Sequence, residues 1–179
     1  PYVVRVSISG AVPGVEVANY FTNRPYGSDP SEVKLIQMFA VDYDYLALYS
    51  PEMLCGRGFS EAYGNERNKV VLNEEAVRLL GYPSPEEALG KQLEMEVLED
   101  PLEVVGVVKN YHQQSLAEPY KPILFFLKER VPFIATPYIS VKMDGPVNSD
   151  CLTEVEQMYR TYFPSALFSY FYLDDYQDS

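Results

Sequence analysis

The alternation of apolar and polar positions along the chain predicts many short strands. Tyr2–Ser9 is rich in β-branched residues and roughly alternating, which is typical of a half-buried strand. Similar patterns predict further strands over Val15–Phe21, Val33–Val41, Lys69–Leu72, Lys91–Leu98, Leu102–Lys109, Pro122–Lys128, Pro137–Met143 and Ala166–Leu173. Segments between them that contain Pro and Gly, such as Thr22–Ser31, are predicted to be loops, and the polar stretch Glu61–Asn68 is predicted to be a surface loop.

Helical patterns are short and begin at residues that cap helices. Asn73 precedes Glu74 and Glu75, which suit the positive end of a helix dipole, and Ser84-Pro85-Glu86-Glu87 is a capping box. Helices are therefore predicted over Asp42–Tyr49, from Asn73 to Gly81, from Ser84 to Gly90, and from Asn148 or Ser149 to Pro164. Many strands with a few short helices and no regular βα alternation predict an α+β fold.

Composition and charge narrow the classes of function. The 179 residues are 47% hydrophobic and carry a net charge of −12, with only 14 Lys and Arg. A nucleic-acid-binding protein needs a basic face to neutralise phosphates, so this class is excluded, and attachment to anionic lipid is disfavoured for the same reason. The longest apolar runs, such as Ile123–Leu127, are far shorter than the roughly 18 residues of a membrane helix. Because the chain starts at Pro1 directly on a predicted strand, we expect it to be a piece of a longer protein.

His112 is the only histidine and hence the only side chain whose ordinary pKa suits proton transfer at neutral pH. One hypothesis is a secreted hydrolase in which His112 and a carboxylate, Asp42 or Glu103, form an acid–base pair. The alternative is a loop histidine that orders a turn through hydrogen bonds. The sequence has no Gly-x-Ser-x-Gly element to supply a nucleophile, so the structural role is favoured.

Clusters of carboxylates offer two interpretations. Glu94, Glu96, Glu99, Asp100 and Glu103 could form a calcium site or a catalytic pair, but Glu94 and Glu96 alternate with apolar residues as on the solvated face of a hairpin. No EF-hand spacing is present, so a solvated face is favoured over a metal site. Further carboxylates at the ends of predicted elements are explained by capping and solvation. These are Asp42, Asp44, Asp174, Asp175 and Asp178.

Other motifs also point away from catalysis. Gly56-Arg57-Gly58 is too short for a phosphate-binding loop, which needs Gly-Lys followed by Ser or Thr between a strand and a helix. Cys55 and Cys151 form no CxxC motif with a neighbouring histidine, so a zinc site is not expected, and whether they form a disulfide is left open. We therefore assign no catalytic, cofactor-binding or metal-binding residue.

The C-terminal part is the densest apolar region of the chain. Its aromatic residues recur at helical and strand spacing, which predicts core, and Phe168–Leu173 is apolar on both faces of its predicted strand except at Ser169. This pattern indicates burial on both sides or a surface that contacts a partner. The aromatic residues are Tyr159, Tyr162, Phe163, Phe168, Tyr170, Phe171 and Tyr172.

Five segments, in order along the chain, resemble MacB-type and FtsX-like ABC-transporter permeases. The Gly-Arg-x-Phe turn, the strand with its Asn-capped helix, the Ala-x-Gly-Lys element and the Val-x-Gly-Val-Val run are the most specific, although Asn110 stands where Asp is common. The segments are VDYDYLALYSPEMLCGRGFS (Val41–Ser60), KVVLNEEAVRLLG (Lys69–Gly81), SPEEALGKQL (Ser84–Leu93), LEVVGVVKNYHQQSL (Leu102–Leu116) and FSYFYLDDYQDS (Phe168–Ser179). Their shared positions Gly56, Arg57, Phe59, Asn73, Gly90, Gly106 and His112 are interpreted as structural.

The resemblance implies the periplasmic core domain of such a permease. Its fold would be a porter-like βαβ subdomain, residues 1–50 and 120–179, interrupted by a mostly β subdomain, residues 51–119. A helix of the first subdomain would precede Tyr2, after a membrane helix, and further membrane helices would follow Ser179.

The resemblance also implies partners and a location. A cytoplasmic ABC ATPase would hydrolyse ATP, a second permease copy would complete a dimer, and a periplasmic adaptor, lipoprotein or hydrolase would be a further partner. The protein would lie in the inner membrane, with this domain in the periplasm. It would take part in efflux, other transmembrane transport or mechanotransmission, and this domain would not be an enzyme. The alternative is a free-standing secreted binding or scaffold domain. Neither the cargo nor the oligomeric state follows from the sequence.

Overall fold

The strands form one hydrogen-bonded sheet across the part of the chain that the computed structural model describes, residues 2–15, 17–111 and 119–173. The order in the sheet is β2-β6-β7-β5-β8-β3-β1-β9, with β4 paired to β7 and a further pairing of β2 with β3. The strands are β1 Tyr2–Ser9, β2 Tyr20–Pro25, β3 Lys34–Val41, β4 Met53–Gly56, β5 Lys69–Asn73, β6 Gln92–Met95, β7 Leu102–Val108, β8 Ile123–Leu127 and β9 Tyr138–Asp144. This mixture confirms the predicted α+β class.

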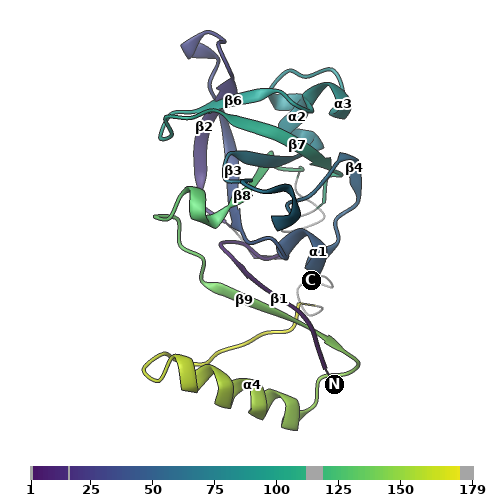
Figure 1. Ribbon diagram of the computed structural model, residues 1–179, viewed down its shortest axis with the longest axis vertical. Coiled ribbons are helices and arrows are strands. Elements are labelled where there is room, and N and C mark those ends of the chain that lie inside the picture. The colour runs from purple at the N-terminus through teal and green to yellow at the C-terminus, as the bar shows by residue number, and fades with distance from the viewer. Residues whose placement is uncertain (1, 16, 112–118, 174–179) are drawn as a thin grey trace.

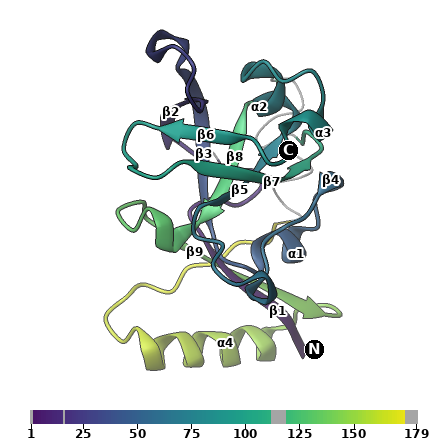
Figure 2. The ribbon, with the colours of Figure 1, turned by 45° about the horizontal axis from the view of Figure 1, so that its top comes forward.

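The helices lie around this sheet. They are α1 Tyr45–Tyr49, α2 Glu74–Leu79, α3 Pro85–Ala88 and α4 Ser149–Tyr162, with short 3-10 turns η1 Pro30–Glu32, η2 Glu61–Tyr63 and η3 Lys128–Arg130. In Figure 1, α2 and α3 lie together beside β7, whereas α4 lies at the opposite end of the molecule, along the ribbon of β1 and β9. Figure 2 shows the same separation from a second direction.

The core has two parts, one on each face of the central strands β3 and β8. On one face Met38 packs with Leu124 and Ala76, and on the other Phe39 packs with Phe125, edge to face, with ring centroids 5.4 Å apart. β3 and β8 are parallel, and every residue of β8 is buried, which explains why its sequence shows a continuous apolar run.

The strand predicted over Val15–Phe21 is wrong in its position. β2 begins only at Tyr20 and continues to Pro25, where Asn23 pairs with Lys34 and Pro25 pairs with Leu93. Pairing with β3 and β6 therefore overrides the loop signal of Pro25, which is the last residue of the strand.

The strand predicted over Ala166–Leu173 is also wrong. Within the described residues this segment joins no ladder of the sheet, although its chain is apolar and aromatic. A strand needs a neighbouring backbone as well as suitable side chains, and β-propensity supplies only the second. Aromatic contacts hold the segment instead, including Phe168 with Tyr159 and Phe171 with Tyr138.

The predicted subdomains share this sheet. Residues 51–119 contribute β4, β5, β6 and β7 with α2 and α3, and they connect to the flanking parts through β5 with β8 and β6 with β2. The division at about residues 51 and 119 stays a prediction.

Candidate functional site

The Gly-Arg-x-Phe turn is held against β7 by very close backbone packing. Gly56 has φ +71°, and a Cβ there would lie 2.8 Å from the Cα of Gly106. A Cβ on Gly106 would lie 3.0 Å from the carbonyl carbon of Arg57 and closer still to its oxygen. The N–H of Arg57 donates to Val105 O at 2.9 Å, and Val105 sits at an irregularity in the pairing of β5 with β7. Both glycines are therefore required for this approach.

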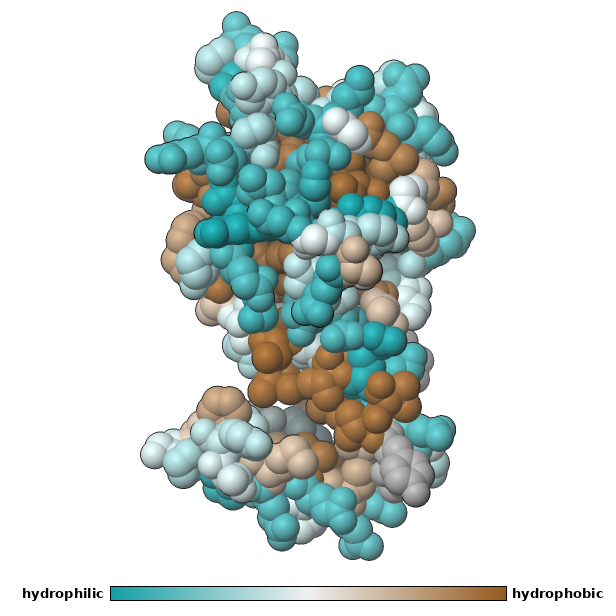
Figure 3. Space-filling model, viewed as in Figure 1, coloured by the Kyte–Doolittle hydropathy of each residue, from teal (hydrophilic) through white to brown (hydrophobic). Residues whose placement is uncertain are grey.

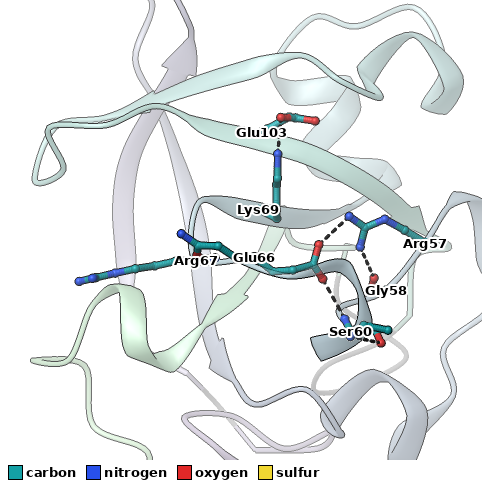
Figure 4. Close-up of polar contacts among 9 residues, drawn as sticks. Arg57, Gly58, Ser60, Glu66, Arg67, Lys69 and Glu103 are labelled. Carbon is teal, nitrogen blue, oxygen red and sulfur yellow. Dashed lines mark hydrogen bonds and ion pairs between the residues drawn. The ribbon is translucent and has the colours of Figure 1, made fainter.

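Arg57 and Glu66 form a largely buried ion pair behind this turn (Figure 4). Arg57 Nη2 lies 2.6 Å from Glu66 Oε1, and Ser60 N donates to Glu66 Oε2 at 2.8 Å. Glu66 is 1% exposed and Arg57 is 31% exposed, while the guanidinium lies 3.8 Å from the centre of the Tyr63 ring. The hydrogen bond to Glu66 raises the pKa of Arg57. The prediction that Glu61–Asn68 is only a surface loop is thus wrong at Glu66, because this carboxylate turns inward to meet a cation.

Removing the carboxylate of this pair tests its structural role. We expect Glu66→Ala to lower the free energy of unfolding by about 2 kcal/mol, because it leaves the Arg57 guanidinium and the Ser60 N–H without their partner. Glu52→Ala, which breaks the exposed pair with Lys109, is the matched control and is expected to have no resolvable effect. Urea unfolding followed by circular dichroism measures both, and equal midpoints for the two variants would contradict the assignment.

Asn73 joins three elements at the N-terminus of α2. Its Oδ1 accepts from Ala76 N at 3.0 Å, which confirms the predicted cap, and also from Ile123 N of β8 at 2.8 Å. Its Nδ2 donates to Lys121 O at 2.8 Å. Asn73 is fully buried, and its bonds with Ala76 N and Ile123 N form away from water.

The acidic hairpin is confirmed as a pair of antiparallel strands, β6 and β7, and most of its carboxylates have partners. Glu94 pairs with Arg24, and Glu96 accepts from Thr22 Oγ1 at 3.0 Å. Glu103 pairs with Lys69. Among the described residues, no group of three or more His, Cys, Asp or Glu side chains is placed to hold a metal ion. The carboxylates therefore crosslink neighbouring strands.

Asp42 and Asp44 tie β1 to the start of α1. Asp42 accepts from Ser7 Oγ at 2.7 Å and from the N–H of Ile8, while Asp44 pairs with Arg5. The prediction that these carboxylates only cap element ends and contact solvent is therefore incomplete, because they bind residues more than 30 positions away in the sequence. His112, Asp174, Asp175 and Asp178 lie outside the described residues, so the pairing of His112 with Asp42 or Glu103 stays a hypothesis.

The ribbon of β1 and β9 exposes its apolar face and buries its polar one. Ser7 and Ser9 are buried, whereas the opposed pairs Val6 with Val141 and Ile8 with Ile139 are exposed. Figure 3 shows a brown, hydrophobic band at the level of this ribbon, above α4. At the start of α4, Cys151 Sγ lies 3.1 Å from Met143 Sδ, and both cysteines of the chain carry free thiols.

The prediction of core for the C-terminal aromatic residues is wrong. Tyr162 is 75% exposed and Leu167 is 85% exposed, and Phe163, Tyr170, Phe171 and Tyr172 are exposed as well. The rings stack on one another along the segment, as with Tyr170 and Tyr172, whose centroids are 5.7 Å apart. This segment and the β1–β9 face form an extensive exposed apolar surface, which is typical of a contact region. Within the described residues, no helix is long and apolar enough to span a membrane.

Residues 2–150 match the model of the MacB-like periplasmic core domain family. The chain is 33% identical, over 122 residues, to the uncharacterised ABC transporter permease YvrN of Bacillus subtilis (strain 168), and this match covers 64% of the chain. It spans only 29% of the length of that curated relative.

Two solved structures share the fold. The extracellular domain of the ABC-type transporter YknZ from Gram-positive bacteria superposes with a TM-score of 0.63 at 15% identity, over 92% of this chain and 78% of that one. The periplasmic region of MacB from Actinobacillus actinomycetemcomitans superposes with a TM-score of 0.59 at 20% identity, over 90% of this chain and 69% of that one. At sequence identities this low, the structural similarity is evidence for the fold alone.

Proposed function

This chain belongs to the family of MacB-like periplasmic core domains and is an extracytoplasmic domain of an ABC-transporter permease, and we propose that it couples ATP hydrolysis in the cytoplasm to action on a substrate or partner outside the membrane. The match of residues 2–150 to the family carries this proposal. The partners would be a cytoplasmic ABC ATPase, a second permease copy and an extracytoplasmic protein.

The internal architecture suits a part that transmits force. Arg57, Glu66 and the glycines Gly56 and Gly106 join a turn rigidly to β7, and Asn73 joins α2 to β8. Such crosslinks would make the turn, β7, α2 and β8 one stiff unit. This unit could move as a rigid body when the membrane-spanning part of the permease moves. Both carboxylate oxygens of Asp42 accept hydrogen bonds from β1, so this carboxylate is engaged in structure.

We further propose that the porter-like subdomain comprises residues 1–50 and 120–179, with residues 51–119 inserted. The open apolar face of Val6, Ile8, Ile139 and Val141 supports this division, because it suits a covering helix from the same polypeptide, placed before Tyr2. Such a helix would bury the face against α4.

Purification of the complete permease tests the proposal. We expect it to copurify with an ABC ATPase, and the complex is expected to hydrolyse ATP even when residues 2–173 are replaced by a short flexible linker, because nucleotide would bind elsewhere. Loss of copurifying ATPase from a correctly inserted, intact permease would contradict the proposal. Abolition of basal ATP hydrolysis by the replacement would contradict the absence of an enzymatic role for this domain.

A further inference from the structure

A cleft of about 630 Å³ is lined by residues of β2 and β6, which pair with each other in the sheet, and by the connections that follow these two strands. One wall comes from β2 and the connection to β3, and the other comes from β6 and the turn that leads to β7. The β2–β3 and β6–β7 hairpins project from the body in Figure 1 and in Figure 2. The lining residues of the cleft belong neither to the Arg57–Glu66 pair nor to the β1–β9 face.

Apolar side chains line the first wall. Tyr26 is 58% exposed and Val33 is 44% exposed, and both face the cleft. Leu35 and Val97 are exposed nearby on β3 and after β6. These groups are available to an apolar side chain of a ligand without any rearrangement of the fold.

The second wall is strongly acidic. Glu94, Glu96, Glu99 and Asp100 line it, and the only basic residue of the lining is Arg24, which is already paired with Glu94. Asp100 lies 3.8 Å from the guanidinium of Arg130, whereas Glu99 makes no ion pair within the part of the chain that the structure describes. The charge of the lining that remains uncompensated is negative.

This combination selects one kind of occupant. A second copy of the chain carries a net charge of −12 and would be repelled, and anionic lipid headgroups would be repelled likewise. We propose that the cleft docks a short basic segment of an extracytoplasmic partner protein, with Lys or Arg beside Glu96 and Glu99 and an apolar side chain against Tyr26 and Val33. This inference rests on the proposed function, because it names the chemistry of the partner surface.

Peptide binding to the 179-residue chain tests the cleft directly. The probe is a fluorescent nine-residue peptide of alternating Lys and Val, followed by anisotropy at low salt, and the same peptide with Glu in place of Lys is the comparison. We expect the Lys peptide to bind and the Glu peptide not to bind. The double variant Glu96→Gln/Glu99→Gln should weaken binding about fivefold to tenfold, since each exposed charge contributes a modest share. Tyr26→Ser should weaken it by a similar factor.

Matched controls separate the cleft from general acidity. Glu87→Gln/Glu154→Gln removes two exposed charges elsewhere, and Tyr162→Ser removes an exposed ring on α4, so both should leave binding unchanged. Equal weakening by the two double variants, or equal binding of the two peptides, would overturn the proposal. Self-association in sedimentation that Glu96→Gln/Glu99→Gln abolishes would identify a second copy as the occupant and overturn it as well. The peptide-binding experiment contains no ATPase, so a failure of the Lys peptide to bind would not contradict the proposed coupling to ATP hydrolysis.

Discussion

Gly106→Ala is expected to lower the free energy of unfolding by about 3 kcal/mol, because the new methyl group would overlap the backbone of Arg57. Neither side can yield easily, since the obstacle is a carbonyl group in a turn that is itself bonded to Val105 and anchored by Glu66. The close approach of two backbones, and not a special φ value, is therefore the cause.

Gly90→Ala is the matched control for this prediction. Gly90 has φ +73° with nothing near its Cβ position, so alanine there costs only the conformational penalty, about 1 kcal/mol. Urea unfolding of the two variants and the parent chain gives both values. Equal losses would show that the packing of Gly106 against Arg57 has been placed wrongly.

Asn73→Ala is expected to cost about 3 kcal/mol, the second large effect. The substitution removes the cap of α2, worth about 1 kcal/mol, and the bond to the Lys121 carbonyl, and it leaves the buried Ile123 N–H without its side-chain acceptor, which adds the penalty of an unsatisfied buried group. Loss of this junction should also loosen β8 from α2, because one side chain serves both elements.

Ser84→Ala is the matched comparison, because Ser84 caps a helix without joining that helix to a strand. Ser84 Oγ caps the exposed helix α3 through a 3.4 Å bond from Glu87 N and is bonded to nothing in a neighbouring strand. Its loss is expected to cost about 0.5 kcal/mol. Thermal and urea unfolding measure both, and hydrogen exchange at Ile123 should increase only in Asn73→Ala. If Ile123 remains protected in that variant, the junction does not depend on Asn73.

Local patterns predicted the parts of this fold that local chemistry determines. The Asn73 cap and the β6–β7 hairpin follow from neighbouring residues, so they could be deduced. The second and third bonds of Asn73 could not, because Lys121 and Ile123 lie 48 and 50 residues away in the sequence. The sequence therefore indicates a cap where the structure has a junction.

Glu66 shows the same limit more sharply. It lies in a polar run where nothing distinguishes it from Glu61, yet one is buried and the other exposed. The difference arises from Arg57, which the Gly56 turn directs toward Glu66. In the aromatic C-terminal part the error had the opposite sign, because aromatic residues such as Tyr162 were expected inside and lie outside.

The proposed coupling implies that ATP hydrolysis in the cytoplasm moves this domain, and we expect the movement to be relative to a second copy of the permease. Double electron–electron resonance between spin labels at Glu154→Cys, on the exposed surface of α4, tests this movement most directly. The label would be placed in the complete permease with its ATPase, with Cys55 and Cys151 replaced by serine. We predict that the distance between the two labels changes between the nucleotide-free and ATP-trapped states. A single unchanged distance distribution in both states, in a complex that hydrolyses ATP, would contradict the account.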